Sequence, residues 1–339
     1  MLSERLRFEI PSMSCGEHRP SHLPNIIVPQ MATTEMVNRF AVLRDTLSST
    51  LDGKNISLSL HVGYATDVSK AKQLLSSSNV QVSSLDIPDV YTLKRFVHDL
   101  KPRIKDKDIA KLLKSGGRKI QSVGSEKLLY RKLNKGVNAF TKDKPLLLRT
   151  HAGLWLETNL GDRLRSMFKG NPNIAFAVEM LSKYQTPDEY MEFIRQLSLT
   201  NDINTPVYAD LDLGHIEEAG YLHQERAGRK EALAVYEDIL SDEHDSKLVA
   251  CTSLNQYDGG DETHASLIHG PLDLTEAMKI LGKAKSRGTI VGSQTVIVEF
   301  YPMDYPTYVS SEGVAFCANL RNAYDTQVNQ SSFALEEVV

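Results

Sequence analysis

Short apolar runs rich in β-branched residues alternate with amphipathic helical stretches from residue 56 onward, and this rhythm restricts the fold more than any other feature of the chain. Strands that alternate with helices are typical of βαβ units and therefore of a parallel sheet. Eight strands separated by helices fit one closed (β/α)8 TIM barrel, an α/β fold. An open doubly wound sheet is the alternative, although no glycine-rich nucleotide loop follows the first predicted strand. We predict the strands at 56–62, 80–87, 119–124, 145–151, 173–179, 206–212, 247–254 and 294–300.

The chain divides into three parts around this repeat. Residues 1–55 contain a Pro- and His-rich segment followed by one helix, and we expect them to form an N-terminal arm outside the barrel. The barrel is expected at 56–310, with an inserted basic helical segment at 101–118. Residues 311–339 have weak periodicity and are expected to form a C-terminal tail.

The composition is that of an ordinary globular protein, with 41% hydrophobic and 24% charged residues. No apolar run approaches the roughly 20 residues needed to cross a bilayer, and the first residues lack the apolar core of a signal peptide. Three cysteines (Cys15, Cys251 and Cys317) cannot form a disulfide framework. We therefore expect a protein of the reducing cytoplasm without a membrane partner.

Charge is unevenly distributed along the chain. The net charge is -4, yet Lys101 to Lys144 contains fourteen basic residues against four acids, a local charge of +10. Such asymmetry predicts an anionic partner such as the DNA backbone. A solvated helical face is the alternative explanation. The candidate phosphate contacts are the basic residues that cluster in the inserted segment: Lys105, Lys107, Lys111 and Lys114.

Ionisable residues lie at or near the ends of five predicted strands. They are His61, His151, Glu179, Asp212 and Glu299. The carboxyl ends of barrel strands converge on one face, where βα loops build active sites. Buried carboxylates that face one another repel strongly, and a divalent cation relieves that repulsion. The sequence therefore predicts a metal site at this face.

Two loop motifs add histidines to the carboxylates. Asp212-Leu-Gly-His215 and Asp261-Glu-Thr-His264 share the same spacing. Mixed imidazole and carboxylate ligands suit zinc, manganese or iron better than calcium. We expect zinc, with manganese and iron as alternatives.

These residues also resemble endonuclease IV and, more widely, the xylose-isomerase-like superfamily of sugar isomerases and epimerases. Residues 211–221 resemble the endonuclease motif Asp-Thr-Cys-His-x-x-x-Ala-Gly-Tyr, with matches at Asp212, His215, Ala219, Gly220 and Tyr221. Residues 261–271 resemble its Asp-Arg-His loop, with one extra residue between the Asp and the His. The stretches 60–71, 150–153, 177–179 and 296–300 resemble its strand motifs, so the similarity covers roughly residues 56–302.

The resemblance implies one to three divalent ions. Their ligands would be His151, Glu179, Asp212, His215, Asp261, His264 and Glu299, with Glu179 and Glu299 as catalytic residues. Two histidines that the family has are missing, one near Val123 at the end of the predicted third strand and one near Ser253 on the seventh. We therefore expect fewer ions than the three zinc ions of endonuclease IV.

Two enzyme classes follow from the resemblance. The favoured one is a hydrolase that cleaves the phosphodiester of abasic or damaged DNA, with metal-activated water as the nucleophile. In that case Trp155 and Tyr221 are candidates to stack in the abasic gap. The runner-up is a sugar or sugar-phosphate isomerase or epimerase with a phosphorylated small-molecule substrate. A related iron enzyme acting on a peptide and a non-catalytic barrel with a degenerate metal site are further alternatives.

Overall fold

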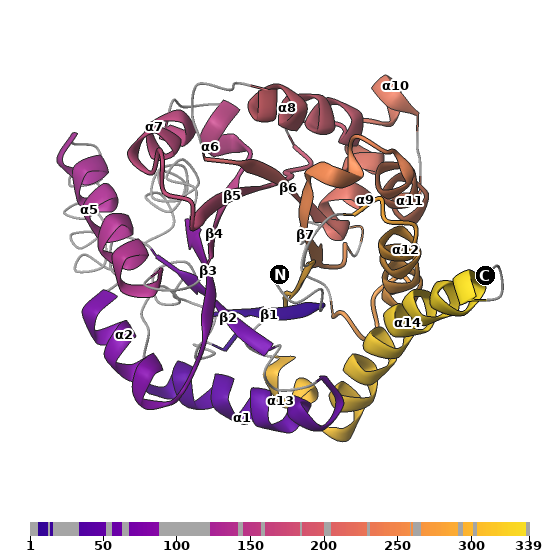
Figure 1. Ribbon diagram of the computed structural model, residues 1–339, viewed down its shortest axis with the longest axis horizontal. Coiled ribbons are helices and arrows are strands. Elements are labelled where there is room, and N and C mark those ends of the chain that lie inside the picture. The colour runs from indigo at the N-terminus through magenta and orange to yellow at the C-terminus, as the bar shows by residue number, and fades with distance from the viewer. Residues whose placement is uncertain are drawn as a thin grey trace, which may run out of the picture.

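Eight parallel strands form a closed barrel, and their order around the barrel is their order along the chain, as the computed structural model shows (Figure 1). The strands are β1 (Arg7–Pro11), β2 (Ile56–His61), β3 (Val82–Ile87), β4 (Leu146–His151), β5 (Ile174–Glu179), β6 (Val207–Asp212), β7 (Val249–Leu254) and β8 (Thr295–Val298). The predicted (β/α)8 fold is confirmed.

The structure describes most of the chain. The described residues are 6–12, 14–15, 34–51, 56–62, 68–87, 123–141, 145–156, 160–183, 185–199, 205–228, 231–257, 259, 266–290, 294–300 and 304–336. The inserted basic segment at 101–118 lies outside them.

Helices surround the barrel (Figure 1). They are α1 (Thr34–Leu51), α2 (Val68–Ser77), α5 (Val123–Phe140), α6 (Gly153–Leu156), α7 (Leu160–Met167), α8 (Pro187–Leu199), α9 (Leu213–Leu222), α10 (Gln224–Ala227), α11 (Ala232–Ser241), the 3-10 helix η3 (Ser246–Leu248), α12 (Leu274–Ser286), α13 (Tyr305–Tyr308) and α14 (Ser311–Glu336). Among these helices, none is both long and apolar enough to cross a membrane.

The barrel starts earlier in the chain than the sequence repeat suggests. Strand β1 (Arg7–Pro11) pairs with β2 on one side and with β8 on the other, so it closes the barrel instead of lying in an arm. The prediction of a strand at 119–124 is wrong at its end, because Val123 and Gly124 are the first residues of α5. The other seven predicted strands correspond to β2 through β8. Residues 311–336, expected as a tail, form the helix α14, which packs against α12 and α1.

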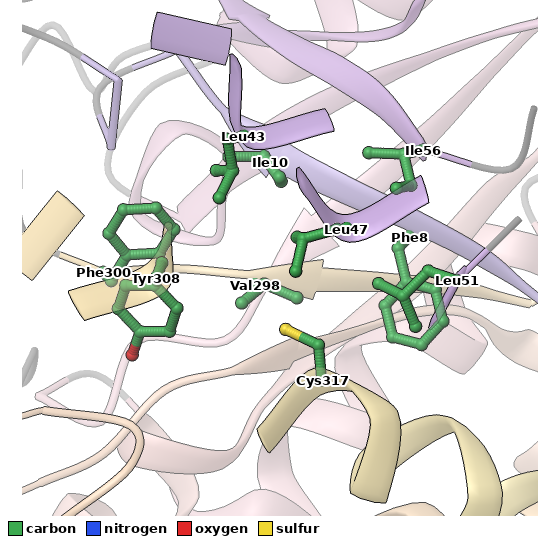
Figure 2. A pocket seen from close by; sticks show the side chains of 10 residues that line it. All are labelled: Phe8, Ile10, Leu43, Leu47, Leu51, Ile56, Val298, Phe300, Tyr308 and Cys317. Carbon is green, nitrogen blue, oxygen red and sulfur yellow. The ribbon is translucent and has the colours of Figure 1, made fainter. Parts of the chain in front are cut away.

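Alternate residues of each strand face the helices. On β1, Phe8 and Ile10 point outward and pack with α1, β8 and α14 around a void of about 10 Å³ (Figure 2). The void holds no more than about one water molecule, and cavities with apolar linings stay dry. This void is therefore a packing defect and not a ligand site. Its lining consists of Phe8, Ile10, Leu43, Leu47, Leu51, Ile56, Val298, Phe300, Tyr308 and Cys317.

The residues between these outward positions fill the inside of the barrel. A small apolar cluster of Ala177, Cys251 and Ile297 is separate from the main core between strands and helices. On β5, Glu179 lies two residues beyond Ala177, so this strand changes from an apolar to a charged interior towards its C-terminal end. The inside of the barrel is therefore charged where active sites of this fold lie.

Candidate metal centre

A buried arginine lies among the charged residues inside the barrel. Arg149 is the fourth residue of β4 and is 0% exposed. Its Nε donates to Asp210 Oδ2 at 2.8 Å, and its Nη2 donates to Ser253 Oγ at 3.0 Å. The same Nη2 lies 3.3 Å from Glu179 Oε2 and 3.2 Å from Glu299 Oε1. One guanidinium therefore links side chains from β5, β6, β7 and the residue that follows β8.

The carboxylates around Arg149 outnumber its single charge. Burial raises the pKa of Asp210 to about 6, despite the opposing effect of Arg149. Burial and the nearby Glu299 raise the pKa of Glu179 well above its ordinary value. Burial alone would lower the pKa of Arg149, but the carboxylates, Asp210 foremost, raise it above its ordinary value. The arginine therefore stays charged, and negative charge is left over for a further cation.

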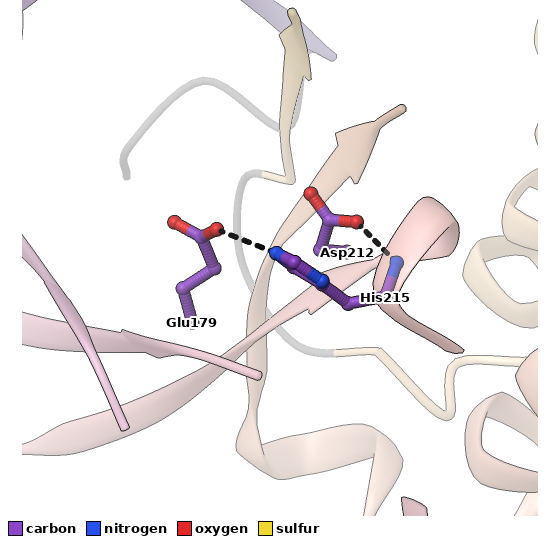
Figure 3. A group of neighbouring side chains, drawn as sticks. All are labelled: Glu179, Asp212 and His215. Atoms are coloured by element: carbon purple, nitrogen blue, oxygen red, sulfur yellow. Dashed lines mark hydrogen bonds and ion pairs between the residues drawn. The ribbon is translucent and has the colours of Figure 1, made fainter. Parts of the chain in front are cut away.

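Two side chains at the ends of β5 and β6 and one from the first turn of α9 form a candidate metal site (Figure 3). One ligand atom from each of Glu179, Asp212 and His215 lies within 4.8 Å of the others, and all three residues are buried. Two ligands of one zinc ion lie roughly 3.5 Å apart. His215 Nε2 is 3.9 Å from Glu179 Oε1, so small side-chain adjustments bring the donors to coordination distance. Two carboxylates and an imidazole suit zinc, manganese or iron.

Neighbouring groups hold these ligands in place. Asp212 caps helix α9 by accepting from the His215 backbone N–H at 2.7 Å, and it also accepts from Asn255 Nδ2 at 3.1 Å. His215 Nδ1 lies 3.2 Å from Glu218 Oε2, and Glu218 accepts a hydrogen bond from Ser182. A proton on Nδ1 shared with Glu218 leaves the lone pair of Nε2 for a metal ion, which is the usual arrangement of a metal-bound histidine.

The other predicted ligands on strands have different partners. His151 is half-buried, with Nε2 3.5 Å from Glu179 Oε2, so it lies next to the cluster. Glu299 Oε1 lies 3.2 Å from Arg149 Nη2, and its charge acts on all three clustered ligands, raising the pKa of each. His61 pairs with Asp86, with 2.7 Å between His61 Nε2 and Asp86 Oδ2, and this contact accounts for a strand-end histidine without any metal.

The remaining predicted site residues lie outside the described part of the chain. They are Asp261, His264, Lys105, Lys107, Lys111 and Lys114. Their roles stay predictions.

The structure accounts for the two missing histidines. The third strand is β3, which ends with Asp86 and Ile87, and Asp86 is the partner of His61. On β7, Ser253 donates to Asp210 at 3.0 Å and accepts from Arg149, so the guanidinium lies beside the position where a histidine was expected. Sequence analysis missed Arg149 and Asp210, since both stand inside their strands and not at the ends.

Comparisons with known proteins add little to this geometry. No protein-family profile and no curated protein sequence matches the chain. A xylose isomerase domain containing protein from Salmonella typhimurium is 11% identical, with a TM-score of 0.46 over 97% of this chain and 98% of that one. An AP endonuclease, family 2, from Brucella melitensis is 12% identical, with a TM-score of 0.44 over 88% and 93%. Likeness at this level says nothing about which reaction the chain catalyses.

Proposed function

We propose that this chain is a metal-dependent enzyme of the xylose-isomerase-like superfamily that moves protons on a small hydroxylated carbonyl substrate, as isomerases and epimerases do. The buried cluster of Glu179, Asp212 and His215 is the observation that carries the proposal. Its donors come from two neighbouring strand ends and from the first turn of α9, and they fit one divalent ion. Zinc is the expected ion, with manganese and iron as alternatives.

The side chains beside the cluster suit proton transfer. A bound ion would polarise the carbonyl and hydroxyl oxygens of the substrate, which acidifies the adjacent C–H bond. Glu299 is partly exposed and is oriented by its contact with Arg149 at 3.2 Å, so it is the candidate general base. His151 is half-buried next to Glu179 and is the candidate group for returning the proton on the solvent side. Glu179 holds the ion instead of carrying the proton.

Exchange of substrate hydrogen with solvent tests this proposal. Protein loaded with zinc, manganese or iron is incubated with a panel of aldoses, ketoses and their phosphates in D2O, and deuterium incorporation is followed by NMR. Glu299→Gln should reduce exchange by at least roughly 100-fold, the usual contribution of a general base, while metal content stays unchanged. Glu312→Gln, on the exposed surface of α14, is the matched control. No exchange with any substrate, or full exchange by Glu299→Gln, would contradict the proposal.

Hydrolysis of abasic DNA is the second candidate, and the +10 charge between residues 101 and 144 is the observation that favours it. Against it, Trp155 is already engaged: its Nε1 donates to Thr150 Oγ1 at 2.8 Å and its ring packs edge-on against Phe176. A stacking role for this ring would require both contacts to be lost. Tyr221 is 39% exposed, but its ring also packs against another ring, with 5.6 Å between the centroids of Tyr221 and Tyr257.

A salt series on an abasic duplex decides between the two candidates. Replacing the four lysines of the basic segment (Lys105, Lys107, Lys111 and Lys114) with alanine should reduce the slope of log affinity against log salt by about one per lost phosphate contact. An unchanged slope would identify the segment as a solvated face and remove the support for the nuclease. Cleavage of the duplex by the metal-loaded protein would favour the nuclease over the isomerase.

A further inference from the structure

The guanidinium of Arg149 lies between the carboxylates of Glu179 and Glu299. Its Nη2 is 3.3 Å from Glu179 Oε2 and 3.2 Å from Glu299 Oε1. The other oxygen of the Glu179 carboxylate, Oε1, faces His215 Nε2 at 3.9 Å. Glu179 therefore divides its two oxygens between a fixed organic cation on one side and the candidate metal site on the other.

Burial and hydrogen bonds hold Arg149 in this position. It is 0% exposed, and its Nε and Nη2 are bonded to Asp210 and Ser253 as well as to the two glutamates. A guanidinium keeps its charge at every pH at which proteins are folded. A divalent ion placed between the glutamates would have to displace this group or lie in contact with a like charge.

Strand β7 does not adjoin β4 in the sheet, but its side chain Ser253 is small enough to admit the guanidinium inside the barrel. Ser253 stands across from Asp212 in the strand pairing, at a position where the resemblance predicts a metal-binding histidine. Its hydroxyl bonds the arginine at 3.0 Å instead. Ser253 on β7 thus stands where a metal-binding histidine was expected, and Arg149 on β4 brings a positive charge to the same space.

We propose that Arg149 permanently occupies a second cation position, so that the site takes one divalent ion, on the Oε1 side of Glu179, with Arg149 positioning Glu179 and Glu299. This inference rests on the metal site of the proposed function and adds the number and place of the ion. In this proposal the guanidinium of Arg149 takes the place of the histidine expected on β7.

Metal counting on the full chain tests the proposal. Protein is stripped with chelator, saturated with Mn²⁺, dialysed and analysed by elemental analysis, and the ion is located in crystals by anomalous scattering. The wild type should hold one equivalent, beside Glu179, Asp212 and His215. Arg149→Met should take up a second equivalent, because the uncompensated carboxylates then attract another ion. Arg149→Lys retains the charge and should hold one.

A second buried arginine provides the matched control. Arg165 is also buried, but it donates to the backbone carbonyls of Thr205 and Leu197, so Arg165→Met should leave the metal count at one even if it lowers stability. Two ions in the wild type, or one ion between Glu179 and Glu299, would overturn the proposal while leaving a metal enzyme. A single ion in folded Arg149→Met would overturn it as well. No ion in the wild type would overturn both this proposal and the proposed function. If Arg149→Met does not fold, the wild-type ion position and the Arg149→Lys count still decide.

Discussion

Glu218 should control metal affinity without touching the metal. Its Oε2 lies 3.2 Å from His215 Nδ1, so its carboxylate fixes the ring orientation and keeps the proton on Nδ1. Burial alone would lower the pKa of His215, but Asp212 and Glu218 raise it above its ordinary value. Loss of such a partner typically weakens metal binding 10- to 100-fold, or about 1.4–2.7 kcal/mol.

Titration of the metal-free protein with Zn²⁺, followed by calorimetry, measures this effect. Glu218→Ala should raise the dissociation constant by at least roughly 10-fold, and Glu218→Gln by less, since its amide oxygen still accepts from Nδ1. Glu217 is the matched control: it is the preceding residue on α9, and the described contacts give it no hydrogen bond or ion pair with the ligands. If Glu218→Ala binds zinc within twofold of the wild type, the argument from ring orientation is wrong.

Two further predictions concern stability. The pKa values of Glu179, Asp212 and Asp210 are raised, to about 6 for Asp210. Bound protons therefore stabilise the metal-free fold fully below about pH 4, and this stabilisation is lost as the pH rises through about 6. The melting temperature measured in chelator should therefore fall between about pH 5 and 7 and recover when zinc is added. A metal-free melting temperature that rises over this range would contradict the raised pKa values of these carboxylates. Gly282→Ala should lower the free energy of unfolding in urea by about 1–3 kcal/mol, because the new Cβ would lie 2.7 Å from the Tyr324 carbonyl oxygen where α12 packs against α14. An unchanged urea midpoint would show that the two helices move apart at no cost in stability.

The barrel could be predicted from sequence because seven of its strands are apolar runs with helices between them. Strand β1 could not, since Arg7 and Glu9 alternate with Phe8 and Ile10 in a run of only five residues. Such a run is indistinguishable from a short half-buried segment until β8 is seen to pair with it. The prediction at 119–124 failed at its end in the opposite way, because Val123 and Gly124 belong to the amphipathic helix α5.

The metal cluster could be predicted in part because its ligands end apolar strands. Glu179 and Asp212 each follow several apolar residues, and a carboxylate there needs a partner. Arg149 could not be predicted, because a lone arginine in LLLRTH indicates equally a barrel-lining cation or a charge at a sheet edge. Only closure of the barrel places Asp210 and Glu299 around it. Long-range pairing of charges has no signature in local sequence.

The pairing of β1 with β8 determines when the barrel can close during folding. Arg7 stands opposite Thr295, so the strand pair that closes the barrel joins residues far apart in the chain. Contacts between residues this distant in sequence close the longest loops, lose the most conformational entropy on forming, and therefore form late. During synthesis β1 leaves the ribosome long before its partner strand β8, which does not exist until nearly 290 further residues have been added. Until then β1 and β2 can pair only as an open sheet with an unpaired edge, the kind of surface that chaperones and aggregating chains both recognise.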